Sequence, residues 1–294
     1  MNDQTKKLPY LNLGCGTRFH TQWTNLDFVK TGEGVIAHNL LNGIPFEDNT
    51  FEVVYHSHVL EHFSKEDAQT LLEECRRVLK SEGILRIAIP DLEQIARFYI
   101  KSLEEAVEEP NDKIKQLNHQ WMIIELIDQA SRHQGGGQMA KHIFQPQLLN
   151  QDFVFQRIGK EGEHLRNWYL ENTHLFENKN TSISTIPSTP NKTSMVRRIK
   201  DAIKIILGRT IEQPEEVTKL NYQKVGQFRL SGEIHQWMYD RYSIKKLLQE
   251  VGFDTIEIKT GFESSIPNWN YFQLDVEGDK IRKPDSLFIE AIKK

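Results

Sequence analysis

Short apolar runs separated by turn residues mark the first hundred positions of the chain. Each run is rich in aliphatic, β-branched or aromatic residues, which is typical of buried strands. The predicted strands are 10–13, 23–28, 34–41, 51–56 and 84–90. Residues 66–79 instead place their apolar side chains on one helical face, and Gly83 is expected to end that helix. Strands that alternate with helices or loops predict an α/β fold with a mostly parallel sheet.

The pattern changes twice after this region. Residues 91–108 and 111–132 predict long helices, whereas residues 177–195 are rich in Ser, Thr, Asn and Pro and predict a mobile loop. The tail returns to α/β character. There we expect a helix at 243–251 closed by Gly252, strands at 254–260 and 286–291, and a long aromatic loop between those strands.

Three parts of the chain follow from this organisation. They are 1–96, a mostly helical insertion at 97–230, and 231–294.

Composition restricts the classes of protein. The chain has 294 residues, of which 38% are hydrophobic and 27% charged, as in globular proteins. Its net charge of -4 provides no basic field for nucleic acid. Its two cysteines exclude a disulfide scaffold and a Cys-rich zinc site. Without a membrane-spanning apolar run or a signal peptide, we expect a cytoplasmic protein.

A Gly-x-Gly turn follows the first predicted strand, at Gly14 and Gly16. Glycines there let the backbone approach a ligand, because a Cβ would collide with it. A dinucleotide fingerprint needs a third glycine and a full crossover helix, but position 19 is Phe19 and only six residues separate Gly16 from Trp23. A nicotinamide-dependent oxidoreductase is therefore disfavoured.

Polar residues end the next two strands. Asp27 ends the second strand, where its carboxylate is suited to accept two hydrogen bonds from a ribose diol. Asn39 follows the third strand and offers a short polar group. Further ordered motifs then follow: PFEDNTFEVV at 45–54, HVLEH at 58–62 and RVLKSEGIL at 77–85.

These motifs, with LNLGCG at 11–16 and NLD at 25–27, resemble class I S-adenosylmethionine-dependent methyltransferases of the methyltransferase type 11 kind. The resemblance covers about residues 8–95 and is weaker over 233–294. It is nearest to bacterial methyltransferases often found with polysaccharide or glycan biosynthesis. The segments ELIDQASRHQGGGQM, HQWMYDRYS and RKPDSLFIEA are similar to that group too.

The resemblance implies a Rossmann-like fold, a seven-stranded sheet whose last strand is antiparallel, and S-adenosylmethionine as the cofactor. Gly14 and Gly16 would lie under its methionine part, Asp27 would hold the ribose hydroxyls, and Asn39 and Leu40 would lie beside the adenine. The end of the fourth strand would lie next to the sulfonium. The implied cofactor-binding residues are Asn12, Leu13, Gly14, Cys15, Gly16, Asp27, Phe28, Asn39, Leu40, His56, Ser57 and His58.

Three features depart from the class pattern. Asn12 stands where many members have an acid that holds the methionine amino group. Asn39 stands where many have Asp, so its oxygen would accept from adenine without charge assistance. The first crossover helix is nearly absent.

Residues 58–62 also spell the His-x-x-Glu-His string of one zinc-peptidase group. No further ligand stands out downstream, and the methyltransferase resemblance accounts for the string, so we expect no metal. His62 and Glu61 are the candidate catalytic residues, with His62 as a base for a hydroxyl acceptor. The alternative is a structural or cofactor-adjacent His62, because methyl transfer from a sulfonium is often driven by positioning alone.

Four residues are candidate substrate contacts. Asp128 and Arg132 precede three glycines that could form a lid, and the alternative is a helix cap with a surface arginine. His235 and Tyr239 precede the late helix, where aromatic faces suit sugar recognition. Trp269 could serve the same purpose in the loop between the last strands. The alternative for each of these is packing at the edge of the core.

Residues 192–209 are basic and have an apolar side. Such a helix either contacts an anionic membrane surface, which would suit a lipid-linked glycan, or packs on the core.

The function that these features favour is methyl transfer from S-adenosylmethionine to a small-molecule or glycan acceptor, with a sugar hydroxyl as the expected group. The alternative is a non-catalytic cofactor-binding or scaffold protein of a biosynthetic complex, which Asn12 and Asn39 keep open.

Overall fold

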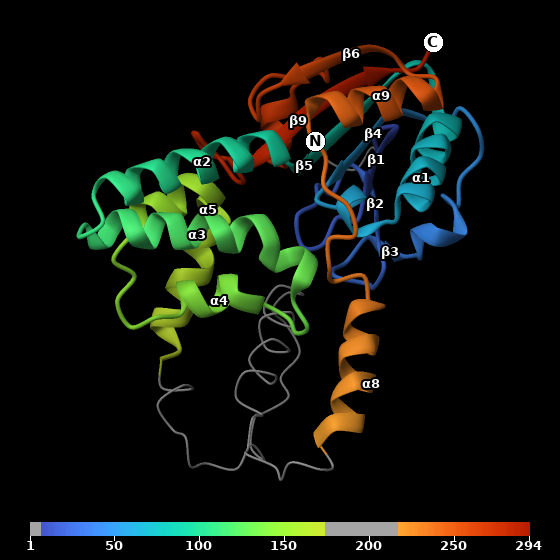
Figure 1. Ribbon diagram of the computed structural model, residues 1–294. Coiled ribbons are helices and arrows are strands. Elements are labelled where there is room, and N and C mark those ends of the chain that lie inside the picture. The colour runs from blue at the N-terminus through green and yellow to red at the C-terminus, as the bar shows by residue number, and fades with distance from the viewer. Residues whose placement is uncertain (1–6, 174–216) are drawn as a thin grey trace.

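The computed structural model describes residues 7–173 and 217–294. The expected loop at 177–195 and the basic amphipathic segment at 192–209 both lie outside the described residues. A seven-stranded sheet forms the larger lobe, and a group of helices forms a second lobe beside it (Figure 1). No helix in the described ranges is long and apolar enough to cross a membrane.

The sheet has the order β3-β2-β1-β4-β5-β9-β6. Every neighbouring pair from β3 to β5 is parallel, and β9 runs antiparallel to both β5 and β6. Six strands thus share one direction and the last one in the sequence opposes them. The strands are β1 (Tyr10–Leu13), β2 (Thr24–Asp27), β3 (Val35–Ala37), β4 (Phe51–Ser57), β5 (Leu79–Pro90), β6 (Asp254–Lys259) and β9 (Ser286–Ile292). This is the class I methyltransferase Rossmann-like fold, as expected.

Helices cover one face of the sheet. On this face lie α1 (Lys65–Val78) and α9 (Arg241–Val251), which pack together over the alternate residues of the strands (Figure 1). Ser64 begins α1 by accepting a hydrogen bond from the Asp67 amide, and Gly252 ends α9 in the left-handed conformation, as predicted. Fully buried leucines of α1 and α9 therefore fix this face.

The expected helix end at Gly83 is wrong. The helix α1 ends at Val78, and Leu79 is already extended as the first residue of β5. The left-handed residue is Glu82, not Gly83. Gly83 is needed for a different reason, because a Cβ there would lie 2.8 Å from the Lys80 carbonyl oxygen. The third strand is also shorter than expected, since a 3-10 turn, η2 (Leu40–Asn42), follows it.

The opposite face has no helix from the first crossover. Residues 14–23, all of them described, contain no helix, as expected. The connection between β6 and β9 covers this face instead, through a 3-10 turn, η4 (Trp269–Phe272), and a small hairpin of β7 (Val276–Glu277) and β8 (Lys280–Ile281). Trp269 packs 6.2 Å from Trp23 and 5.2 Å from Tyr55, ring centre to ring centre, so it belongs to the core and is not available to a sugar.

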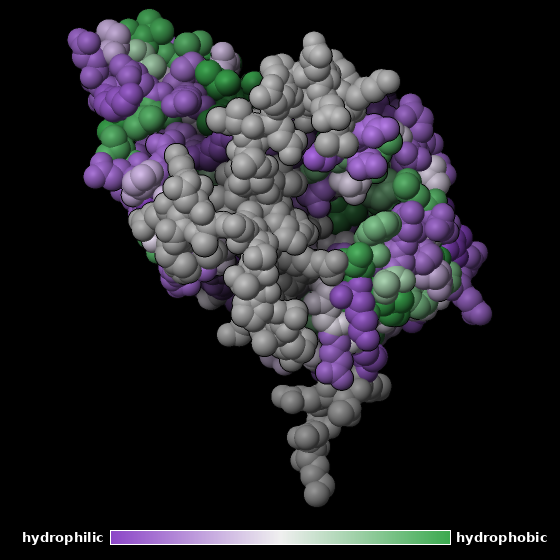
Figure 2. All heavy atoms as spheres, turned by 90° about the horizontal axis from the view of Figure 1, so that it is seen from below, coloured by the Kyte–Doolittle hydropathy of each residue, from purple (hydrophilic) through white to green (hydrophobic). Residues whose placement is uncertain are grey.

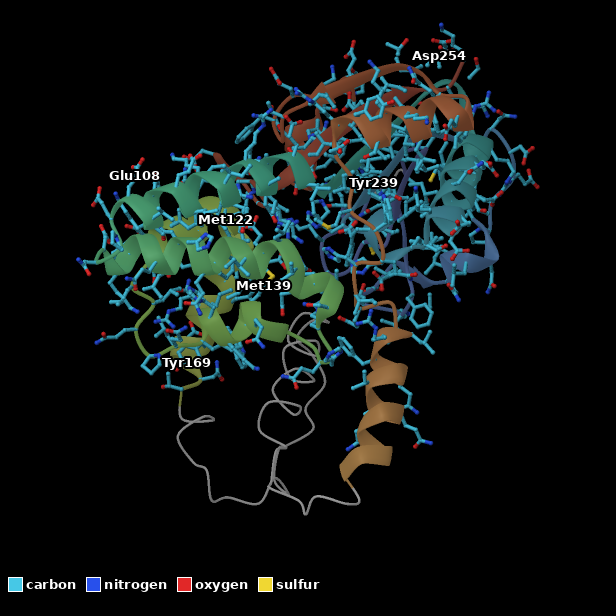
Figure 3. All side chains as sticks on the ribbon, in the orientation of Figure 1. Glu108, Met122, Met139, Tyr169, Tyr239 and Asp254 are labelled. Atoms are coloured by element: carbon cyan, nitrogen blue, oxygen red, sulfur yellow. The ribbon has the colours of Figure 1, made fainter. Side chains whose placement is uncertain are left out.

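The helical lobe lies between β5 and α9 in the sequence. It comprises α2 (Leu92–Glu108), α3 (Lys113–Ser131), α4 (Gly137–Ile143) and α5 (Gln151–Glu171), whereas α8 (Val217–Arg229) stands apart from these four helices (Figure 1). Its own apolar core includes Trp121, Met122 and Val154. Figure 3 shows Met122 and Met139 directed into this lobe. Because α2 follows β5 directly, the lobe extends from the carboxyl edge of the sheet.

Candidate functional site

Three parallel strands end side by side at the carboxyl edge of the sheet. Leu13 of β1 lies opposite Leu26 of β2 and opposite His56 of β4. The residues that follow, from Gly14, Asp27 and Ser57, are therefore neighbours. Ligands of open α/β sheets bind at this edge.

The glycine turn is fixed by the chain around it. Gly14 and Gly16 have φ of 58° and 55°, which side chains rarely adopt. A Cβ on Gly14 would overlap Cγ2 of Val59, whereas a Cβ on Gly16 would meet nothing within 4 Å. The Cys15 amide donates to the Leu26 carbonyl at 3.0 Å, which ties the turn to β2. Packing thus requires the first glycine, while open space lies over the second.

Asp27 supports the same turn from β2. Its side chain is buried, with 6% exposed. Oδ2 accepts a hydrogen bond from the Gly16 amide at 2.7 Å, and Oδ1 accepts one from the Val29 amide at 3.3 Å. Each carboxylate oxygen has a second lone-pair direction. The carboxylate is therefore held beside the glycine turn and retains acceptor capacity for a ligand.

The structure uses both asparagines internally. Asn12 is buried and donates through Nδ2 to the Arg18 carbonyl at 3.1 Å and to Asn25 Oδ1 at 3.4 Å. It thereby holds the loop that replaces the first crossover helix. Asn39 accepts a hydrogen bond from the Leu41 amide at 3.1 Å and begins η2.

Apolar side chains are exposed just beyond the ends of β2 and β3. Phe28 is 70% exposed and Leu41 is 61% exposed, while Leu40 packs against the core. Sequence reasoning selected Phe28 and Leu40 but missed Leu41. Exposed apolar groups beside a polar turn offer a surface for a flat ring.

A second group of polar residues follows β4. Glu61 lies in a short 3-10 turn, η3 (Leu60–His62), and its side chain is fully buried. The carbonyl oxygen of Glu61 accepts hydrogen bonds from the amides of Gln236 at 2.7 Å and Trp237 at 3.2 Å. The two segments that carry the candidate residues Glu61, His62, His235 and Tyr239 are therefore joined through the backbone.

His58 connects this group to β9. Its Nδ1 lies 3.2 Å from Glu61 Oε1, and its Nε2 lies 2.8 Å from Ser286 Oγ. His58 has φ of 53°, which is uncommon for a residue other than glycine. Strained backbone of this kind is concentrated at functional sites. Ser286 was missed, although the segment that contains it was recognised.

Two imidazoles lie against the Glu61 carboxylate. His235 Nε2 is 3.9 Å from Glu61 Oε1. The His62 and His235 rings are nearly perpendicular, with centres 5.0 Å apart. Burial lowers the pKa of His235 to about 3, so its ring is neutral near neutral pH. Burial opposes ionisation of Glu61, but His58, His62 and His235 together hold its pKa below the usual range.

Tyr239 closes the same region. Its carbonyl oxygen accepts a hydrogen bond from the Leu92 amide at 3.0 Å, just beyond β5. Its hydroxyl is buried and meets no hydrogen-bond partner within residues 7–173 and 217–294. Burial raises the pKa of Tyr239 to about 12, with Glu61 adding to the effect. Figure 3 shows Tyr239 in the segment before α9, between the sheet and the helical lobe.

Asp128 and Arg132 lie at the end of α3 and hold neighbouring backbone. Asp128 accepts hydrogen bonds from the amides of Gln138 at 2.7 Å and Met139 at 3.3 Å, which caps α4. Arg132 donates to the Glu233 carbonyl at 2.7 Å. These contacts position the segment that carries His235, and the Asp128 carboxylate is directed at α4.

An ion pair lies beside His58 that sequence reasoning missed. Glu161 of α5 is 2.7 Å from Lys283, which precedes β9. Burial opposes ionisation of Glu161, but Lys283 lowers its pKa to about 2, with a smaller contribution from His58. The pair joins the helical lobe to the sheet.

Burial of His56 makes the free energy of unfolding depend on pH. It is fully buried, no described residue bonds to either ring nitrogen, and burial lowers its pKa to about 4. Between about pH 4 and about pH 6.5, the unfolded chain therefore binds more protons at His56 than the folded chain does. The free energy of unfolding should therefore fall on acidification, by up to about 1.4 kcal/mol per pH unit.

Urea unfolding at about pH 7 and about pH 5 measures this effect. We expect a smaller loss of stability in His56→Leu than in the wild type. His133→Leu, at an exposed histidine, should keep the wild-type loss. Equal losses in all three proteins would contradict the assignment to His56.

Comparison with known proteins supports the sequence reasoning over part of the chain. Residues 11–87 match the family model described as a methyltransferase domain. No curated protein matches the chain. Many solved structures do.

Three of these structures show the range of similarity. An S-adenosylmethionine-dependent methyltransferase from Thermotoga maritima, described as a possible histamine N-methyltransferase, is 12% identical, with 97% of this chain and 82% of that chain covered and a TM-score of 0.34. The DszA carbon methyltransferase is 20% identical, with 31% and 30% covered and a TM-score of 0.24. A geranyl diphosphate C-methyltransferase from Streptomyces coelicolor, in complex with Mg²⁺, geranyl diphosphate and S-adenosyl-L-homocysteine, is 16% identical, with 29% and 40% covered and a TM-score of 0.24.

The chain spans only part of the length of many solved structures that it matches. The DszA carbon methyltransferase and three further structures are aligned over only 30% to 55% of their own length. The family match likewise spans roughly a quarter of this chain, but it includes the glycine turn, Asp27 and Glu61. Over residues 11–87 the chain therefore matches the methyltransferase domain family, on a sheet with the class I methyltransferase fold.

Proposed function

We propose that this protein transfers a methyl group from S-adenosylmethionine to a hydroxyl of a small-molecule or glycan acceptor. The observation that carries the proposal is the contact between the Gly16 amide and the buried Asp27 carboxylate, inside the segment that matches the methyltransferase domain. It presents an open glycine turn and a fixed carboxylate on adjacent strands.

The cofactor would extend along the strand ends. Asp27 would accept hydrogen bonds from the ribose diol, and the turn at Leu13, Gly14, Cys15 and Gly16 would lie under the methionine part. Phe28, Asn39 and Leu40, with the newly found Leu41, would surround the adenine. Asn12 would act by supporting the turn, since its amide is used inside the protein.

The reacting methyl group would lie beyond β4, near His56, Ser57 and His58. Glu61 and His62 would then assist loss of the acceptor proton, with His235 and Tyr239 beside them. Asp128 and Arg132 would contribute by fixing the segment that carries His235. The insertion at 97–230 would cover the acceptor and set specificity.

A sugar hydroxyl in polysaccharide biosynthesis, a cytoplasmic location and membrane contact through 192–209 are parts of the same proposal. They are supported by the sequence resemblance and by the polar character of the site. Hydrophilic residues cover much of the described surface visible in Figure 2, with apolar residues in separate patches.

A non-catalytic binding protein is the second candidate. The internal use of Asn12 favours it, because the acid that many methyltransferases have at this position is absent. Turnover distinguishes the two candidates. A scaffold would form no S-adenosylhomocysteine with any acceptor, whereas the enzyme would form it in step with the methylated product.

Replacing Asp27 tests the cofactor site. Asp27→Ala should weaken S-adenosylmethionine binding by about tenfold or more, which is about 1.4 kcal/mol, because two charge-assisted hydrogen bonds to the ribose are lost. Calorimetric titration measures the change. Asp27→Asn keeps one acceptor for the Gly16 amide and should fold while also binding less tightly.

Asp254→Ala is the matched control, since Asp254 lies on the distant edge strand β6 (Figure 3). Its affinity should equal that of the wild type. If Asp27→Ala and Asp27→Asn both bind as the wild type does, the carboxylate does not hold the ribose.

A further inference from the structure

Three side chains beside the proposed acceptor site converge on one point. Glu61, His62 and His235 each offer one ligand atom, and these atoms all lie within 4.8 Å of one another. Two come from η3 and the third from the segment before α9. The backbone hydrogen bonds from Gln236 and Trp237 to the Glu61 carbonyl hold the two segments together.

The Glu61 carboxylate has only imidazoles as charged neighbours. It is fully buried, and no residue in the described ranges gives either oxygen a well-aligned hydrogen bond. His58 Nδ1, 3.2 Å from Oε1, forms an ion pair with it when the His58 ring is protonated. Burial of a charged carboxylate is costly, and buried charges in proteins are therefore paired or bound to metals.

The two histidines are arranged as ligands. His62 Nδ1 lies 3.0 Å from the Ile234 carbonyl oxygen, which can only accept, so Nδ1 is the donor in this contact and Nε2 is the ring nitrogen that would bind the ion. Metal-bound histidines are usually fixed in this way. His235 Nε2 is 3.9 Å from Glu61 Oε1, too far for a hydrogen bond. Ligand atoms of one tetrahedral Zn²⁺ lie about 3.3 Å apart, so small side-chain rotations would close this distance.

We propose that Glu61, His62 and His235 bind a divalent transition-metal ion, with Zn²⁺ as the preferred ion, through one carboxylate oxygen and two imidazole nitrogens. Two histidines and one glutamate are a known donor set for zinc, and three protein ligands leave a fourth position open. His58, which the sequence pattern paired with His62, instead lies between Glu61 and Ser286 and would orient the carboxylate.

The role of the ion rests on the proposed function, although its binding does not. In the open position it would bind the acceptor hydroxyl and lower the pKa of that group. Glu61 and His62 would thus assist loss of the acceptor proton through the ion that they hold, and the proton would pass to water. The acceptor oxygen would form a bond to the methyl carbon, and the carbon–sulfur bond would break. Its electron pair would return to sulfur, which leaves S-adenosylhomocysteine.

Metal binding to the full chain tests the proposal. The protein is stripped with a chelator, dialysed and titrated with ZnCl₂ by calorimetry, and with CoCl₂ by visible absorption. The wild type should bind one ion per chain, and Co²⁺ should give the absorption of a low-coordinate nitrogen- and oxygen-bound ion. Glu61→Gln and His235→Ala should each weaken binding by about 100-fold, because each removes a ligand.

His164→Ala is the matched control, since His164 is exposed and forms its ion pair with Glu277 elsewhere. It should bind Zn²⁺ as the wild type does. Circular dichroism verifies that each variant folds. His235→Asn is used if His235→Ala does not fold. Absence of binding by folded wild type would overturn the proposal, as would binding that survives both the Glu61 and the His235 substitutions.

The same samples are titrated with S-adenosylmethionine, which separates the two proposals. Zn²⁺ binding without cofactor binding would support the metal site and contradict methyl transfer. Cofactor binding without Zn²⁺ binding would overturn the metal site alone.

Discussion

Arg86→Met is expected to lower the free energy of unfolding by about 3–5 kcal/mol, because it leaves two buried carboxylates without their cation. Arg86 on β5 is fully buried. Its guanidinium donates to Asp275 Oδ2 at 2.8 Å and to Glu290 Oε1 at 2.7 Å. It also donates to the carbonyls of Thr260 and Glu263 and lies 4.4 Å from the Trp269 ring centre.

These contacts hold the β6–β9 connection on the face of the sheet that has no crossover helix. Urea unfolding measures the loss. Lys101→Met removes an exposed ion pair to Glu105 and should change stability by no more than about 0.5 kcal/mol. Combining Arg86→Met with Asp275→Asn and Glu290→Gln should recover part of the loss. A loss below about 1 kcal/mol in the single variant would contradict this account of the network.

Gly14→Ala should destabilise the protein by about 2–5 kcal/mol. The left-handed conformation costs a residue with a Cβ about 1–2 kcal/mol, and an overpacked contact costs about 1–3 kcal/mol more. The added methyl would overlap Val59 Cγ2. Unfolding of the variant and the wild type, without any ligand, measures the difference.

Two further variants separate the two causes. In Gly14→Ala/Val59→Ala the overlap is removed. The double variant should therefore lose less free energy of unfolding than the sum of the losses in Gly14→Ala and Val59→Ala. Gly16→Ala has the same left-handed conformation without an overlap and should lose only about 1–2 kcal/mol. Equal losses for Gly14→Ala and Gly16→Ala would show that Val59 does not restrict the turn.

Local sequence patterns predicted the sheet well. The strands β1, β2, β4, β6 and β9 lie close to their predicted ranges, because short apolar runs bounded by turn residues have few other solutions. The end of α1 was wrong because glycine at 83 suggested a helix cap. A glycine is needed at position 83 because the Lys80 carbonyl approaches it closely, and this approach depends on how β5 pairs with β4.

Long-range packing decided what the patterns could not. Trp269 fills the sheet face that the missing crossover helix leaves, and only the position of the β6–β9 connection shows this. The helices α4 and α5 follow a glycine run and a loop, and they were not predicted. The capping of α4 by Asp128 likewise depends on a turn of the chain between residues 128 and 138.

The candidate site divides in the same way. The strand–turn–strand pattern around Gly14 and Asp27 is local, so the sequence sufficed to select these residues. The meeting of Glu61 with His235, 174 residues later, depends on the path of the segment before α9. Ser286 and the Glu161–Lys283 pair escaped notice because single polar residues have no periodic signal.

Calorimetric titration of S-adenosylmethionine and S-adenosylhomocysteine into the folded wild type tests the central claim most directly. The account predicts saturable binding of both compounds, with one molecule per chain. If folded protein binds neither compound, either alone or with sugar acceptors present, the glycine turn and Asp27 do not form a cofactor site, and the proposed methyl transfer is contradicted.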